Sequence, residues 1–272
     1  MSPPLPPGKD YAHVYFQFDS LPLAIISTVI CTAFFCILIY NTTKASSSFV
    51  RWTYFYFTGW GLLRVVGFTM RTVCLVGDNG MNFGLCITAM VFGSIGYIPL
   101  VKVLVQNVFS IAKTKYPSLP YIHLERVVSL FFWGLTGCVI AFLNLYLPNL
   151  PAEATASQVI LRDFGYWGLA LLAVLPTVFG LCHVIGQPIQ IQQLSQVIIV
   201  LGLLMTLKMS LALYKNYHPK DAKEEVFFYT INFLPELVYM VFYLHPGIAN
   251  EFAEVERGVV TVDKEGFSLA DV

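Results

Sequence analysis

The chain has 272 residues, of which 57% are apolar, 15% are aromatic and 12% are charged. A soluble domain carries roughly 25% charged residues, so this composition excludes an ordinary soluble protein. Sixteen basic and sixteen acidic residues cancel, and this balance gives no sign of a nucleic-acid partner. We therefore expect an all-α, multi-pass integral membrane protein of the plasma membrane or the endoplasmic reticulum.

Seven stretches of the chain are long and apolar enough to be membrane spans. A bilayer core of about 30 Å is crossed by roughly 20 apolar residues in a helix. The sequence predicts a seven-transmembrane-helix bundle within residues 21–247, with spans at 21–40, 52–76, 83–109, 127–147, 164–185, 192–214 and 226–245. Residues 1–20 form a proline-rich lip, and residues 248–272 form an acidic tail in solvent. With the N-terminus outside, the inner loops collect more Lys and Arg, which predicts a cytoplasmic C-terminus.

Four predicted spans contain charged side chains, which are costly in hydrocarbon and therefore face the bundle interior. Arg64 lies at the centre of the second span and Glu236 at the centre of the seventh, so equal depth predicts an ion pair. Arg71 follows Arg64 by two helical turns and shares its face. Lys102 and Lys208 lie nearer the span ends, where long side chains can extend toward the head groups. A pair that only locks the fold is the alternative to a functional one.

The seventh predicted span has the densest polar pattern. It carries polar and aromatic side chains at three- and four-residue spacing: Tyr229, Asn232, Glu236, Tyr239 and Tyr243. Pro235 removes a backbone donor beside the carboxyl group and interrupts the helix. Broken helices beside charged residues at mid-depth form the binding sites of many transporters. We therefore expect this stripe, together with Arg64 and Arg71, to bind a substrate.

Motifs for metal, nucleotide or nucleophilic chemistry are missing from the sequence. There is no phosphate-binding G-x-x-x-x-G-K-[ST] loop and no H-E-x-x-H, and the five histidines are scattered singly. We therefore expect no metal and no cofactor. All six cysteines fall within predicted spans. Cys74 and Cys86 flank one short turn and would form a disulfide only if that turn faces an oxidising compartment, and small apolar filler is the simpler role.

Three stretches resemble sequences of fungal heptahelical membrane proteins. Residues 61–67 (GLLRVVG) resemble an Arg-x-x-Gly pattern, residues 93–100 (GSIGYIPL) a Gly-x-x-Pro stretch, and residues 235–247 a last span that ends in His-Pro-Gly. Two related families share these features: a lipid-translocating exporter family associated with resistance to sterol-like and sphingoid toxicants, and an uncharacterised seven-span family. The resemblance implies seven spans and a lipid bilayer around them.

Three functions are compatible with these features. The first is a translocator or exporter of hydrophobic or amphipathic small molecules, in which Arg64 and Glu236 meet the polar part of the substrate. The second is a membrane-embedded isoprenoid cyclase or isomerase of fungal specialised metabolism. There Glu236 would be the catalytic general acid, and aromatic faces would stabilise a carbocation. The third is a receptor-like protein, which rests on the count of seven helices alone.

Overall fold

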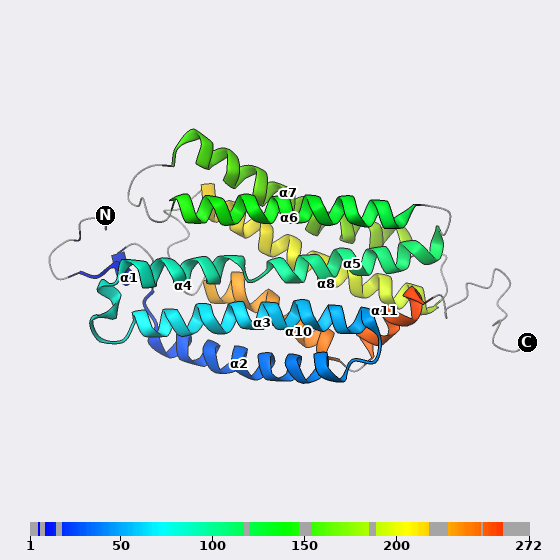
Figure 1. Cartoon of the computed structure of the whole chain (residues 1–272), viewed down its shortest axis with the longest axis horizontal. Helices are drawn as coiled ribbons and strands as arrows, with labels where there is room; N and C mark the ends of the chain where they lie inside the picture. The colour runs from blue at the N-terminus through cyan, green and yellow to red at the C-terminus, as the bar shows by residue number, and fades with distance from the viewer. Residues whose placement is uncertain are drawn as a thin grey trace, which may run out of the picture.

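The computed structural model describes residues 5, 9–14, 18–116, 120–146, 154–184, 189–217, 228–245 and 247–257. Within these ranges the chain forms helices and no strands, which confirms the all-α prediction. The elements are α1 (Tyr11–Val14), α2 (Leu21–Lys44), α3 (Ser48–Cys74), η1 (Gly77–Met81), α4 (Phe83–Ile95), α5 (Ile98–Lys115), α6 (Tyr121–Tyr146), α7 (Ala156–His183), α8 (Ile189–Tyr217), η3 (Phe228–Phe233), α10 (Leu234–Leu244) and α11 (Ile248–Glu256). The axes of the long helices lie roughly along the long axis of the bundle, with α1 and η1 at one end and α11 at the other (Figure 1).

Five helical segments are long and apolar enough to cross a membrane: Leu21–Lys44, Phe83–Lys113, His123–Tyr146, Ala156–His183 and Ile191–Tyr214. The other two predicted spans correspond to α3 and to η3 followed by α10. Helix α3 has 27 residues but contains three arginines. Helix α10 has 11 residues, which span only about 16 Å at 1.5 Å per residue. The chain is therefore a multi-pass membrane protein with five candidate spans, and α3 and α10 complete the bundle.

The surface is apolar, unlike that of a soluble protein, and the largely apolar interior holds a few charged side chains. Large apolar side chains lie exposed along the outer helices, including Val29, Leu130, Ile160 and Trp167, each more than half accessible. Four charged side chains are instead buried inside the described bundle: Arg64, Arg71, Lys208 and Glu236. This distribution suits a hydrocarbon solvent, in which exposed apolar groups are stable and charges need partners.

Side-chain caps explain where several helices begin. The Ser20 hydroxyl accepts a bond from the backbone N–H of Leu23, and the Ser47 hydroxyl accepts one from Val50. Thr155 opens α7 with a capping box in which its hydroxyl and the Gln158 side chain each satisfy the other's backbone N–H. Such caps satisfy donors that have no partner within the helix, and so fix the residue at which each helix starts.

Two of the predicted spans are interrupted. The third is two helices, α4 and α5, separated by a turn at Gly96 and Tyr97 just before Pro99. The seventh begins with the π-helical turn η3 and continues as α10, with Pro235 in its first turn. Proline lacks the backbone donor that would continue a preceding helix, which accounts for both positions. The interruptions place non-helical or widened backbone inside the bundle rather than at its ends.

The predicted solvated tail from residue 248 is wrong for its first nine residues. Helix α11 occupies Ile248–Glu256, and its Ala249, Phe252, Ala253 and Val255 side chains are buried, chiefly by packing of the helix on α5. The apolar residues recur at helical spacing and so form one face, which an overall acidic composition hides. Residues 258–272 lie outside the described part of the chain.

The N-terminal lip is attached to the bundle through α1. The carboxylate of Asp10 accepts bonds from the backbone N–H of His13 at 2.9 Å and from its ring Nδ1 at 2.6 Å. Burial opposes ionisation of Asp10, but the hydrogen bonds and charge of His13 outweigh it and lower the pKa of the carboxyl group. The Tyr11 ring packs on Phe83 of α4 with centroids 5.0 Å apart, which places the lip over the start of α4.

Glycines allow close approach of neighbouring helices, as at Gly180, where α7 meets α8. A Cβ added there would lie 2.7 Å from Cγ1 of Ile199 and 3.0 Å from the carbonyl oxygen of Ser195. We expect Gly180→Ala to lower the unfolding free energy in detergent by about 1–3 kcal/mol, since the backbone oxygen cannot yield as a side chain does. Gly137→Ala in α6 is the matched control, because nothing lies within 4 Å of its added Cβ. Equal stability of both variants would contradict this account of the α7–α8 contact.

Candidate functional site

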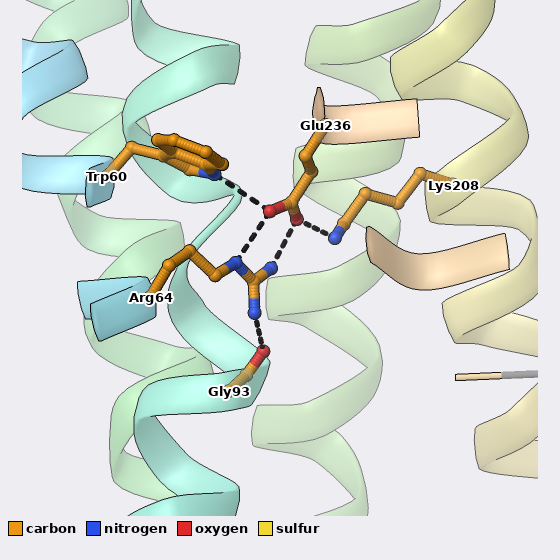
Figure 2. Close-up of polar contacts among 5 residues, drawn as sticks. All are labelled: Trp60, Arg64, Gly93, Lys208 and Glu236. Atoms are coloured by element: carbon orange, nitrogen blue, oxygen red, sulfur yellow. Dashed lines mark hydrogen bonds and ion pairs between the residues drawn. The ribbon is translucent and has the colours of Figure 1, made fainter. Parts of the chain in front are cut away.

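The predicted ion pair between Arg64 and Glu236 is present at the centre of the bundle (Figure 2). The Arg64 Nε donates to Glu236 Oε2 at 2.6 Å, and its Nη2 donates to Oε1, so the guanidinium grips the carboxylate with two parallel bonds. Both side chains are essentially inaccessible, at 1% and 0% exposure. The planar fork of arginine matches a carboxylate in this geometry, and the pair joins α3 to α10.

Lys208 of α8 also binds Glu236, and this corrects the prediction that it extends to the head groups. Its Nζ donates to Glu236 Oε1, its side chain is 1% exposed, and the ring centroid of Tyr97 lies 5.0 Å from Nζ. The prediction used only the position of Lys208 along its span. Helix α8 turns this side chain toward the interior, where a carboxylate and an aromatic face replace the lost water.

Trp60 is a fourth member of the site that the sequence analysis missed. Its indole Nε1 donates to Glu236 Oε2 at 2.8 Å, so the two carboxylate oxygens receive bonds from three side chains (Figure 2). Trp60 precedes Arg64 by four residues, a spacing that places two side chains on one helix face. That spacing is the signal in the sequence that could have identified it. We call Trp60, Arg64, Lys208 and Glu236 the charge cluster.

The break between α4 and α5 makes room for the charge cluster. Nη1 of Arg64 donates to the carbonyl oxygen of Gly93, in the last turn of α4, where carbonyls no longer have partners within the helix. A Cβ at Gly96 would lie only 2.5 Å from Nε of Arg64. Gly93 and Gly96 therefore both contact Arg64: Gly93 accepts its hydrogen bond, and Gly96 leaves space for its guanidinium.

The interruption of the seventh span positions Glu236. Pro235 and Glu236 are both in the first turn of α10, directly after the π-helical η3. The N-terminal end of a helix carries a partial positive charge, so an acidic residue in the first turn is stabilised there. Short π-helical segments occur frequently at functional sites. The interruption therefore lies next to the residue whose carboxylate joins the cluster.

Arg71 lies apart from Glu236 but lines one cavity together with Arg64. The cavity lies between α3 and α4 and is also lined by Phe18, Gly67, Phe68, Ala89, Met90 and Gly93. The centres of water molecules can occupy about 10 Å³ of it, which is room for roughly one water. The guanidinium of Arg71 lies 4.3 Å from the ring centroid of Phe18 and 5.2 Å from that of Tyr229. The two arginines therefore share one face, as predicted, and the cavity connects them.

The aromatic stripe of the seventh span does not line a single cavity. Tyr239 donates to the carbonyl oxygen of Leu100 at 3.2 Å, and Tyr243 hydrogen-bonds with Asn107, so both pack against α5. Their rings stack with centroids 5.8 Å apart. Tyr229 lies away from this pair, where its ring stacks on Phe68 and contacts Arg71. The side chain of Asn232 lies outside the described residues. Of the predicted substrate-binding residues, Arg64 and Glu236 meet directly, and Tyr229 meets Arg71 instead.

Lys102, the other charged residue within a predicted span, lies outside the charge cluster. Lys102 donates to Ser129 at 3.0 Å and is only partly buried. Among the residues that the structure describes, no group of three or more His, Cys, Asp or Glu side chains could hold a metal ion. The charge cluster and the adjoining arginine-lined cavity are therefore the candidate site.

Comparisons with known proteins identify no relative of this chain: no family model, no curated protein and no solved structure matches it.

Proposed function

We propose that this protein is a translocator of amphipathic, lipid-like molecules, and that the charge cluster is the element that rearranges during transport. One observation carries the proposal: a single carboxylate, buried between two interrupted helices, is shared by cations from two other helices. Interrupted helices that meet charged residues in the membrane interior are how many transporters build the site around which their halves move. We also propose that all seven predicted segments lie within the membrane, with the N-terminus outside.

Sharing of the carboxylate gives the bundle two alternative arrangements. Glu236 Oε1 accepts from both Arg64 on α3 and Lys208 on α8. If either helix moves away, the carboxylate keeps one cation and the buried charge is never left alone. A leaving cation would need another partner, and the polar head of a substrate can be that partner. The proposed mechanism is therefore an exchange of partners at Glu236, which a pair of one cation and one anion would not permit.

The cavity beside α3 favours an anionic head group as that polar part. It runs from Arg71, near the α1 end of the bundle, to Arg64 at the charge cluster, and its other lining side chains include Phe18, Phe68 and Met90. Guanidinium groups bind phosphate and carboxylate with two parallel hydrogen bonds. With room for about one water, the cavity is closed to a lipid here, so passage requires α4 to move away from α3.

The same contacts argue against the cyclase hypothesis. A general acid needs a protonated carboxyl group that faces its substrate. The oxygens of Glu236 instead accept from Arg64, Lys208 and Trp60, which is the pattern of an ionised carboxylate used only as an acceptor. The adjoining cavity is lined by Arg64 and Arg71, whose positive charges would oppose a carbocation.

Transport in reconstituted vesicles tests the proposal with a variant expected to fold. Lys208→Met leaves the Arg64–Glu236 pair intact but removes the exchange of partners, so we expect the translocation rate to fall at least tenfold. The probe is a fluorescent single-chain alkyl phosphate, followed by quenching of the outer leaflet, and an alkyl ammonium of equal chain length reports head-group preference. Lys102→Gln is the control, since Lys102 contacts Ser129 rather than the charge cluster. Wild-type protein that moves neither probe faster than protein-free vesicles would overturn the proposal.

A further inference from the structure

Two cysteine side chains meet at the end of the bundle that carries α1. Cys74 is the last residue of α3 and Cys86 lies in the first turn of α4, and their Sγ atoms are 3.4 Å apart. Both side chains are buried, at 1% and 0% exposure. The other four cysteines lie within the long helices: Cys31, Cys36, Cys138 and Cys182. A contact between two sulfur atoms therefore distinguishes this corner of the molecule.

The connection between α3 and α4 creates this contact. The chain reverses through η1, where Gly77 has a positive φ of 60°, a conformation that residues with a side chain rarely adopt. Asn82 then starts α4 by accepting the backbone N–H of Leu85 at 3.1 Å. The turn is short and fixed at both sides, so the ends of the two helices hold the thiols face to face. Sulfur atoms in van der Waals contact reach bonding distance, about 2.05 Å, with only a small movement of the side chains.

We propose that Cys74 and Cys86 form a disulfide bond in the mature protein, which closes the corner between α3 and α4. The two thiols lose two protons and two electrons as the sulfur–sulfur bond forms. The electrons reduce the disulfide of a thiol oxidoreductase to a dithiol, through the usual mixed-disulfide exchange. Because both cysteines end up buried, the exchange takes place during folding, and burial then shields the bond from reductants.

The disulfide assigns a compartment to this end of the protein. Such bonds form and persist in the secretory lumen and at the cell exterior, whereas the cytosol keeps thiols reduced. The α1 end of the bundle therefore faces the lumen or the exterior. This assignment uses chemistry independent of the distribution of Lys and Arg among the loops, and it does not depend on the proposed transport activity.

The bond also fixes the turn on which the described part of the N-terminal lip packs. Gly80 of η1 lies beside Cys86, whose Sγ is 3.9 Å from the Gly80 carbonyl oxygen. A Cβ added at Gly80 would lie 2.8 Å from the Asp10 carboxylate, so the N-terminal lip rests directly on this turn. Phe18, which also belongs to the lip, places its ring 4.3 Å from the guanidinium of Arg71. A disulfide between Cys74 and Cys86 would therefore keep η1, on which the lip packs, in one position.

Peptide mapping of the full-length protein tests the bond. Native membranes are treated with N-ethylmaleimide, denatured in its presence and digested without reductant. We expect four alkylated cysteines before reduction, with the Cys74 and Cys86 peptides joined at about 2 Da less than the sum of their reduced masses. The joined peptide should vanish in Cys74→Ser and persist in Cys31→Ser. Complete alkylation of both Cys74 and Cys86 before reduction would overturn the proposal.

A second measurement separates a bond from packing of two thiols. Wild-type protein that is folded and purified with a reductant present throughout should have a Tm in detergent several degrees lower than protein prepared without it, because the cross-link that restricts the unfolded chain never forms. The reductant should leave the Tm of the Cys74→Ser/Cys86→Ser double variant unchanged. If the reductant shifts the Tm of neither protein, the two cysteines act only as small buried side chains and the proposal is wrong.

Discussion

Glu236→Gln should lower the unfolding free energy by about 3–5 kcal/mol, because it leaves two buried cations facing each other without their common carboxylate. Arg64 and Lys208 are each 1% exposed, so water cannot replace the lost partner. The measurement is reversible unfolding in mixed detergent micelles. Glutamine has nearly the same shape as glutamate, so cavity formation does not contribute and the loss reports charge.

The other two charges of the cluster should tolerate replacement better, in a defined order. Lys208→Met leaves a neutral Arg64–Glu236 pair with its two parallel bonds, so its stability should lie within about 1 kcal/mol of wild type. Arg64→Met leaves a neutral Lys208–Glu236 pair but also leaves the Gly93 carbonyl without its donor, at a cost of about 1–3 kcal/mol. We therefore expect Glu236→Gln to be the most damaging and Lys208→Met the least.

Combination of two changes tests the cause of that order. Lys208→Met added to Glu236→Gln removes one of the two stranded cations, so the double variant should be more stable than Glu236→Gln alone. Coupling of this sign is a property of charge and would not arise from loss of packing. If the two changes prove additive, or if the three single variants are equally stable, the charge cluster does not have the energetics described here.

Gly96→Ala is expected to lower the unfolding free energy by about 3 kcal/mol although it adds a single methyl group. The added Cβ would lie 2.5 Å from Nε and 2.6 Å from Cζ of Arg64. A free arginine side chain would move aside at little cost. This one donates to Glu236 and to the Gly93 carbonyl, so displacement breaks charge-assisted bonds. Stability in detergent and the translocation rate should both fall.

Gly134→Ala provides the matched control for this methyl group. Gly134 lies in α6, and nothing is found within 4 Å of its added Cβ. Alanine is favoured over glycine in a helix by about 1 kcal/mol, so this variant should be as stable as wild type or slightly more so. A Gly96→Ala protein as stable as the control would show that Arg64 can leave its position freely.

The sequence predicted the composition of the site in part. The equal depth of Arg64 and Glu236 predicts that they pair, and depth follows directly from position along an apolar run. Trp60 was within reach of the same argument, since it lies one helical turn before Arg64. The bond from Arg64 to the Gly93 carbonyl, by contrast, depends on how α3 and α4 pack.

Lys208 shows what sequence reasoning could not supply. The polar residues of α8 are spread around the helix rather than gathered on one face, so no polar stripe indicates which face turns inward. The direction of a side chain is then decided by rotation of the whole helix, which is set by its contacts with α7, α5 and α10. The small-residue contact at Gly180 helps fix that rotation for α7 and α8.

Composition and the lengths of the apolar runs determined that this chain is an all-helical, multi-pass membrane protein, because a bilayer imposes both requirements on any sequence that enters it. They also determined that Arg64 and Glu236 lie at the same depth. Tertiary packing alone decided that Lys208 joins Arg64 at Glu236, that Tyr229 turns to Arg71 rather than to Glu236, and that Cys74 meets Cys86. The physical reason is that burial depth is a property of one helix, whereas the angular position of a side chain is a property of the helices that surround it.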